Sequence, residues 1–261
     1  MLWVSMSWTI IKTRGFHEYA ISRLAETHAF LKLRPTTWQG TNVRYSLITP
    51  TLLRPSLERL CASIDAQSCR DWEHLIAVDT VINSAAERML ARIQHAQRVI
   101  WQCPRPHRNF GNTCRHAASL RAQGDYIFYL DDDIYLADEN VLHVLECVTA
   151  AWAIFPMLLE GNRFFNDPPG YERTDTANFI VQRSLGTWPD IADYAADGNL
   201  VERLRREHSY QSLPDCRPLV VMPRMNFGDK WFPWGKLHNE FKLRKARVRS
   251  WGSRLKRRLR I

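Results

Sequence analysis

The chain has 261 residues, 45% of them hydrophobic, which is enough to bury a full core in one large domain or two small ones and excludes disorder as the default. Its formal net charge of +9 favours an acidic partner such as nucleic acid or an anionic membrane surface. The excess lies in residues 236–261, where 11 Lys/Arg and a single Glu give +10 and leave the rest of the chain at −1.

The apolar residues 1–11 are too few to span a bilayer, and they lack the basic start and the small-residue cleavage site of a signal peptide. The cysteines form no CxxC pair, so the sequence indicates neither a zinc site nor a disulfide framework. We therefore expect the protein to reside in a reducing cytoplasm. The six cysteines are Cys61, Cys69, Cys103, Cys114, Cys147 and Cys216.

Residues 1–43 form an N-terminal extension to which we assign no function. Four residues in it are spaced for one face of an amphipathic helix, which Pro35 would end near Arg34. These residues are Ile21, Leu24, His28 and Leu31.

From Arg44 onward, short apolar runs alternate with helix-like segments, a pattern typical of repeated strand-helix-strand units in an α/β layer. Ligands of such sheets bind at the carboxyl ends of the parallel strands. Asp79 and the triplet Asp131–Asp133 occupy such ends. The predicted strands are residues 45–48, 75–78, 99–101 and 126–130.

Three helices are predicted between these strands. The first begins at Pro55, a residue that suits the first helical position. The second begins at Asn112 or Thr113, either of which can cap it, and stops at Gly124. The apolar faces of the first and third helices are Leu57, Leu60, Cys61 and Ile64, and Leu142, Leu145 and Val148.

Three adjacent carboxylates at a strand end raise each other's pKa unless cations neutralise them. Mg2+ and Mn2+ prefer one or two carboxylates together with phosphate oxygens and water. If the segment is extended, Asp131 and Asp133 point to one side and Asp132 to the other, which makes a DxD pair. The alternative is a solvated turn followed by a helix that Asp138 caps.

Several motifs occur in a fixed order around this triplet: ITPTLLRP, SIDAQ, IAVD, NFGNTCR and GDYIFYLDDD. This order resembles glycosyltransferase family 2, whose members have the GT-A fold and the patterns P-T-x-N-R, S-I-x-x-Q, V-D, N-x-G-x-x-x-A-R-N and G-x-Y-I-x-x-L-D-x-D. The resemblance spans about Arg44 to Leu204. Leu53 stands where the family usually has Asn, and His116 stands where Asn commonly follows the arginine.

The resemblance implies a GT-A domain over residues 44–230, with a mixed central sheet flanked by helices and a basic tail at 231–261. It places Pro50 and Thr51 along the nucleotide and Asp79 on a base N–H, although Asp79 could instead cap a helix. It places Asp133 on the metal and Asp131 on the metal or the ribose. The other candidate nucleotide-sugar-binding residues are Arg54, Asn109, Gly111, Arg115 and Asp132.

Two of these residues have alternative roles. Arg115 would reach the base or the diphosphate, or it is a surface arginine. Asp132 would contact the nucleotide sugar, or it would simply orient the turn.

A candidate catalytic base lies in ADGNLVERL, which resembles the family's E-D-x-D-L-x-x-R-L and has Ala196 in place of the first acid. The resemblance makes Asp197 the base. The alternatives are that Asp197 is the N-cap of a helix over residues 200–206, or that Asp193 is the base. Residues 176–183 resemble the strand beside the acceptor pocket, or they are sheet core.

The resemblance therefore implies a metal-dependent, inverting transfer of a sugar from a nucleoside diphosphate donor, most commonly a uridine diphosphate sugar. The acceptor would be a hydroxyl of a saccharide or lipid-linked molecule, as in cell-surface polysaccharide synthesis. Mn2+ or Mg2+ would neutralise the leaving diphosphate, and Asp197 would take the proton of the acceptor hydroxyl.

The basic tail has the composition of a helix that lies in a membrane interface. It would hold the enzyme peripherally on the inner face of the cytoplasmic membrane, where a lipid-linked acceptor is found. Alternatively the tail packs on the domain or binds nucleic acid, although we expect no nucleic-acid partner. The apolar residues of the tail are Leu237, Phe241, Val248, Trp251, Leu255 and Leu259.

Two other functions fit parts of the sequence. A sugar nucleotidylyltransferase also uses an α/β sheet, acidic residues and a metal, but it needs a glycine-rich phosphate loop, and no glycine occurs between Gly40 and Gly111. A nucleic-acid-binding protein would act through the basic tail, but it gives the ordered motifs no purpose.

Overall fold

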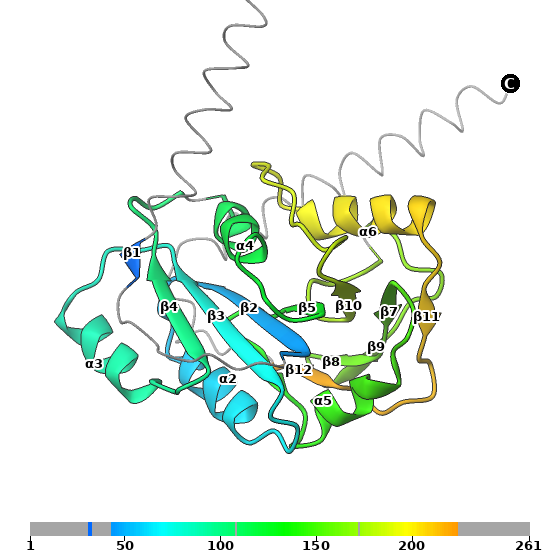
Figure 1. Cartoon of the computed structure of the whole chain (residues 1–261), viewed down its shortest axis with the longest axis horizontal. Helices are drawn as coiled ribbons and strands as arrows, with labels where there is room; N and C mark the ends of the chain where they lie inside the picture. Colours follow the sequence, from blue (N-terminus) through cyan, green and yellow to red (C-terminus); the bar gives the residue numbers. More distant parts are fainter. Residues whose placement is uncertain (1–30, 33–42, 108, 172, 224–261) are drawn as a thin grey trace, which may run out of the picture. The chain divides into compact units, whose positions relative to one another are not determined.

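A computed structural model describes residues 31–32, 43–107, 109–171 and 173–223 (Figure 1). The predictions for residues 1–30 and for the basic tail lie outside these ranges, and the boundaries of the extension and the tail stay predictions. Leu31 and Lys32 form strand β1, so the helix expected to run to Arg34 does not include them.

The main sheet has eight strands in the order β1-β4-β3-β2-β5-β10-β7-β11. Four central strands, β4, β3, β2 and β5, are parallel, whereas β10 is antiparallel to β5 and β1 is antiparallel to β4. The sheet is therefore mixed, as expected. Its strands are β1 (Leu31–Lys32), β2 (Tyr45–Thr51), β3 (Trp72–Val78), β4 (Arg98–Gln102), β5 (Tyr126–Tyr129), β7 (Trp152–Ile154), β10 (Phe179–Gln182) and β11 (Gln211–Ser212).

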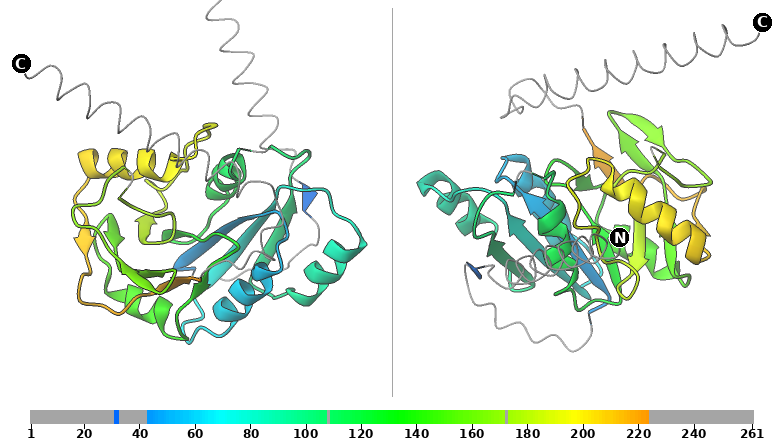
Figure 2. Two further views of the ribbon diagram at one scale, coloured as in Figure 1. Left: turned by 180° about the vertical axis from the view of Figure 1, so that it is seen from behind. Right: turned by 90° about the horizontal axis from the view of Figure 1, so that it is seen from above.

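Helices cover both faces of this sheet, and its central strands are therefore buried on both sides (Figures 1 and 2). On one face, Tyr45 and Leu47 of β2 share a core with Leu57 of α2. On the other face, Ile48 shares a core with Leu200 of α6. The helices are α2 (Ser56–Asp65), α3 (Ser84–Arg92), α4 (Asn112–Ser119), α5 (Val141–Val144) and α6 (Ala196–Glu207), with the 3-10 turn η1 (Leu145–Cys147).

A second, smaller sheet has the order β6-β12-β8-β9. Leu136, Met157 and Val220 from three of its strands belong to the same core cluster as α2 and α5. The second sheet therefore extends the core on that face. Its strands are β6 (Tyr135–Leu136), β8 (Met157–Leu159), β9 (Asn162–Phe164) and β12 (Val220–Met222).

The four predicted strands are present, with end points shifted by up to three residues. The first helix begins at Ser56, and Pro55 is its N-cap. The second helix begins at Asn112, but its N-cap is Gly111 rather than Asn112 or Thr113, and it ends at Ser119, five residues before Gly124. Gly124 lies against β2, where an added Cβ would come within 2.6 Å of the Ser46 nitrogen.

The third predicted helix is divided into α5 and the 3-10 turn η1, and Val148 follows in extended conformation. In the part of the chain that the structure describes, no helix has the length and apolar character needed to cross a bilayer.

Candidate active site

The ends of three neighbouring parallel strands bring most of the predicted site residues to one edge of the main sheet. Thr51 at the end of β2 pairs with Val78 at the end of β3, and Asp79 follows directly. On the other side of β2, Ile48 pairs with Tyr129 at the end of β5, so Asp131–Asp133 lie close beyond. This edge is the location at which parallel α/β sheets bind their ligands.

The aspartate triplet forms a turn, and the Ile134 N–H donates to the Asp131 carbonyl at 3.3 Å. The strand alternation that we used to orient the three side chains therefore does not apply. Asp132 is nevertheless the buried member, at 1% exposure, and Thr51 Oγ1 donates to its Oδ2 at 2.6 Å. Asp131 and Asp133 are partly exposed, which leaves these two accessible to a ligand.

Two arginines neutralise part of the charge of the triplet. Arg54 pairs with Asp132 and, at 2.9 Å, with Asp133. Arg115 pairs with Asp131, and its guanidinium lies 4.8 Å from the centre of the Trp188 ring. Arg115 is only 5% exposed, so it is not a surface arginine.

Asp133 has the features expected of a cation ligand. Burial raises its pKa to about 6, and the charges of Asp131 and Asp132 raise it as well, whereas Arg54 lowers it. Its Oδ1 is buried and has no hydrogen-bond partner among the described residues. A buried carboxylate oxygen of this kind is stabilised by a cation, and carboxylates suit Mg2+ or Mn2+.

A second group of acids, on other elements, interacts electrostatically with the triplet. Asp197 lies in the first turn of α6, whose N-cap is Ala195, so Asp197 is not the cap of that helix. Burial raises the pKa of Asp197, and its Oδ1 accepts the Gly198 N–H at 2.7 Å. Asp193, the alternative base, is exposed and accepts the Ala195 N–H at 3.0 Å, so it serves as a local turn residue.

Asp175 is a site residue that the sequence reasoning missed. Burial raises its pKa to about 7, and the charges of Asp131, Asp197 and Asp133 contribute to the shift. Its Oδ1 accepts the Ala177 N–H at 3.0 Å. The available signal was its position directly before the predicted strand at 176–183, which the structure shows as β10.

Two exposed aromatic residues lie beside this group of acids and were also missed. Phe110 and Tyr194 are 43% and 65% exposed, and their rings meet edge to face with centroids 5.3 Å apart. The Phe110 carbonyl accepts a hydrogen bond from Arg115 at 2.8 Å, and Arg115 in turn pairs with Asp131 of the triplet.

Asn109 and Gly111 shape the start of α4, the helix that carries Arg115. Asn109 Nδ2 donates to Thr113 Oγ1 at 2.7 Å. Gly111 is the N-cap, with φ of 76°, and a Cβ added to it would lie 2.7 Å from Pro50 Cβ. Glycine therefore allows α4 to approach the end of β2 closely.

Leu53 departs from the family pattern at a position with unusual backbone geometry. Its φ is 61°, in the left-handed region that asparagine adopts more readily than leucine. Its N–H donates to Thr51 Oγ1 at 2.8 Å, so the turn after β2 keeps its shape despite the substitution. His116, the other departure, contacts the Trp188 carbonyl through Nδ1 at 2.8 Å.

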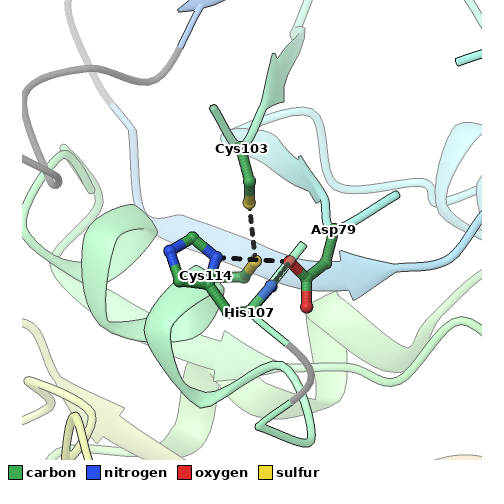
Figure 3. Close-up of side chains that lie close together, drawn as sticks. All are labelled: Asp79, Cys103, His107 and Cys114. Atoms are coloured by element: carbon green, nitrogen blue, oxygen red, sulfur yellow. Dashed lines mark hydrogen bonds and ion pairs between the residues drawn. The ribbon is translucent and has the colours of Figure 1, made fainter. Parts of the chain in front are cut away.

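Asp79 belongs to a cluster of side chains that the sequence did not predict (Figure 3). His107 donates its backbone N–H to Asp79 Oδ1 at 2.8 Å, and its ring Nδ1 lies 3.3 Å from the same oxygen. Cys103 and Cys114 lie beside them with sulfurs 2.9 Å apart. Asp79 is not a helix cap, because Asn83 caps the next helix, α3.

The contacts with Asp79 and Cys103 raise the pKa of His107 to about 9. The sequence indicated no zinc or disulfide site, and in the structure Cys103 and Cys114 are free thiols that meet within this cluster without a CxxC spacing.

No known protein family matches the sequence, and no curated protein does. Solved structures match the fold. TarS 1-349 from S. aureus superposes with a TM-score of 0.58 over 69% of this chain and 60% of that one, at 13% identity. The same TarS segment in complex with UDP-GlcNAc gives a TM-score of 0.57, over 70% of this chain and 59% of that one.

The mannosyltransferase PcManGT from Pyrobaculum calidifontis, in complex with GDP-Man and Mn2+, gives a TM-score of 0.52 at 13% identity. That match covers 84% of this chain and 68% of the other. The chain has a GT-A fold. The predicted fold class is therefore confirmed, whereas identities this low carry over the fold alone, and the chain spans about 60% of the TarS segment.

Proposed function

We propose that the chain is a metal-dependent, inverting glycosyltransferase of family 2 that transfers a sugar from a nucleoside diphosphate donor to a hydroxyl. The observation that carries this proposal is the meeting of two groups of acids at the ligand-binding edge of a GT-A sheet. Asp131 and Asp133 form one group, and Asp175 and Asp197 form the other. The first group would bind a metal ion together with the diphosphate of the donor, and the second group would supply a general base.

The donor would lie along the ends of β2 and β3. Thr51 and Pro50 would line the nucleotide, and Asp79 would accept a base N–H. Both contacts from His107 reach Asp79 Oδ1, so Oδ2 would be the acceptor. The solved structures that share the fold contain UDP, UDP-GlcNAc or GDP-Man, which supports a nucleoside diphosphate sugar, and we propose a uridine donor.

Asp133 and Asp131 would hold Mn2+ or Mg2+, because the triplet keeps one uncompensated negative charge after pairing with Arg54 and Arg115. A bound cation would supply Lewis-acid neutralisation of the charge that develops on the leaving diphosphate. Arg115 is fixed by Asp131 and the Trp188 ring, so its charge would already be held in place when a diphosphate binds beside it.

Asp197 would accept the proton of the acceptor hydroxyl. Burial raises its pKa towards the range in which a carboxylate is an effective general base near neutral pH. Thr176 Oγ1 donates to its Oδ2 at 3.4 Å, and the Gly198 N–H donates to Oδ1, so the side chain is oriented from two directions. Attack by the hydroxyl on the anomeric carbon from the side opposite the diphosphate inverts that carbon.

The acceptor would be a saccharide or a lipid-linked molecule. The exposed rings of Phe110 and Tyr194 offer apolar faces of the kind on which sugar rings stack. The basic residues 236–261 would hold the enzyme on the inner face of the cytoplasmic membrane, where lipid-linked acceptors are found.

Titration calorimetry with UDP and Mn2+ tests the metal site. We expect Asp133→Ala to lose Mn2+-dependent UDP binding, because it removes the carboxylate with the unpartnered oxygen. Asp125→Ala, which removes an exposed aspartate directly before β5, is the matched control and should bind as the wild type does. Unchanged affinity in Asp133→Ala would refute the metal assignment, and GDP and TDP in place of UDP would identify the base.

A further inference from the structure

The cluster at the ends of β3 and β4 contains four metal-ligating side chains: Asp79, Cys103, His107 and Cys114. One ligand atom from each lies within 4.8 Å of all the others (Figure 3). Three of the residues are at most 5% exposed, and the His107 side chain is 6% exposed. The aspartate triplet described above shares none of these residues.

Three of the four residues lie in or directly after elements that the fold holds together, and His107 lies in the loop between β4 and α4. Asp79 follows β3, and its N–H donates to the Thr51 carbonyl at 2.8 Å. Cys103 follows β4, and its N–H donates to the Val78 carbonyl at 2.9 Å. Cys114 is the third residue of α4. The backbone therefore fixes three of the four positions before any ion binds, which lowers the cost of assembling a site.

Two sulfurs, one imidazole nitrogen and one carboxylate oxygen are a closed set of four ligands, the number that Zn2+ takes in structural sites. Soft sulfur ligands select zinc over Mg2+ and Mn2+, which the carboxylates of Asp131 and Asp133 suit better. A disulfide between Cys103 and Cys114 would leave unexplained why His107 and Asp79 converge on the same point. All four ligands together favour a metal.

We propose that Asp79, Cys103, His107 and Cys114 form a structural Zn2+ site. The ion would tie the ends of β3 and β4 to the first turn of α4. It would also fix Asp79 through one carboxylate oxygen. The site does not depend on the proposed sugar transfer, and it would exist in a chain with any activity.

The test uses the full chain, purified under reducing conditions without chelator from zinc-supplemented cells. We expect about one zinc per chain by elemental mass spectrometry. Replacing the bound zinc with Co2+ should give a sulfur-to-cobalt charge-transfer band and the visible bands of tetrahedral cobalt. Carboxylate ligands give no charge-transfer band of this kind, so the spectrum separates this site from the aspartate triplet.

Variants assign the ligands. Cys103→Ser and Cys114→Ser should lose the charge-transfer band and the bound zinc, while Cys61→Ser, which alters a buried cysteine of α2, should keep both. Asp133→Ala should also keep both, even if it loses UDP binding. If a cysteine variant fails to fold by circular dichroism, His107→Gln keeps the sulfurs and should weaken zinc binding at least about tenfold in chelator competition.

Three results would overturn the proposal. The first is a reduced wild-type chain that gives no sulfur-to-cobalt band. The second is a band that persists in both Cys103→Ser and Cys114→Ser. The third is a freshly purified chain in which these two cysteines resist alkylation until reductant is added, because that chain would contain a disulfide in place of the metal.

Discussion

Thr51 Oγ1 donates a hydrogen bond of 2.6 Å to Asp132 Oδ2 and so joins the end of β2 to the turn after β5. The same hydroxyl accepts the Leu53 N–H at 2.8 Å. Asp132 is almost fully buried, and it also pairs with Arg54. We infer that Asp132 positions the turn and leaves its neighbours Asp131 and Asp133 partly exposed.

Replacing Thr51 with valine tests this role. Thr51→Val keeps the shape of the side chain but leaves a buried oxygen of Asp132 without its donor, so we expect a loss of about 1–3 kcal/mol in the free energy of unfolding. Thr149→Val, at an exposed threonine, is the control and should change it little. Chemical denaturation measures both, and equal stability of the two variants would contradict a structural role for this hydrogen bond.

The contact of Gly111 with Pro50 can be separated from backbone strain. Gly111 and Gly161 both have positive φ, 76° and 86°, but a Cβ at Gly161 meets nothing within 4 Å. Gly161→Ala should cost about 1–2 kcal/mol of stability from strain alone. Gly111→Ala should cost about 1–3 kcal/mol more, because the methyl group collides with Pro50.

Gly111→Ala should also weaken UDP binding, because α4 carries Arg115 and would move away from the end of β2. Denaturation midpoints and calorimetry on the two alanine variants provide the comparison. Equal losses of stability in both variants would show that the packing against Pro50 contributes nothing.

The sequence predicted the parts of the fold that depend on local pattern. Four apolar runs became the parallel core of the main sheet, and the ordered motifs indicated the GT-A fold. The strands of the second sheet are only two or three residues long, so they contain too little periodicity to be read. Gly124 does not end α4 but donates its N–H to Ser46 of β2, a contact 78 residues away in the sequence that no local pattern reveals.

The site was predictable where a motif ran continuously through the chain. Asp131–Asp133 and Arg115 lie within such motifs, and the structure places them together. Asp175 and the pair Cys103 and Cys114 were missed because only the tertiary fold brings them to their neighbours. The predicted orientation of the triplet assumed a strand where the chain turns.

Asp175 should make the stability of the protein fall as the pH rises. Burial raises its pKa in the folded state to about 7, above its ordinary value near 4, so the folded state binds the proton more tightly than the unfolded state does. The stabilising contribution of the protonated carboxyl is present at pH 4 and is lost as the pH rises through 7. Asp175→Asn, which resembles the protonated form, should be more stable than the wild type at pH 8.

Denaturation midpoints at pH 5 and pH 8 check this prediction, and the advantage of Asp175→Asn should shrink at the lower pH. Asp167→Asn is a control that should show no such change between these two pH values. Hydrogen bonds from Ser212 and Tyr210 lower the pKa of Asp167, so its contribution is present at both pH 5 and pH 8 and is lost only as the pH falls further, through the lowered pKa. An advantage of Asp175→Asn that is equal at both pH values would mean that Asp175 does not titrate in this range.

Asp197→Asn separates binding from catalysis. The amide oxygen can still accept the Gly198 N–H, but it cannot take a proton from the acceptor. We expect unchanged UDP affinity and a fall in kcat of about a hundred- to ten-thousand-fold, the usual contribution of a general base. Asp193→Asn, at the exposed neighbour, should keep full turnover, and Asp175→Asn tests the other buried acid. A variant of Asp175 or Asp193 that loses turnover while Asp197→Asn keeps it would assign the base to that residue instead.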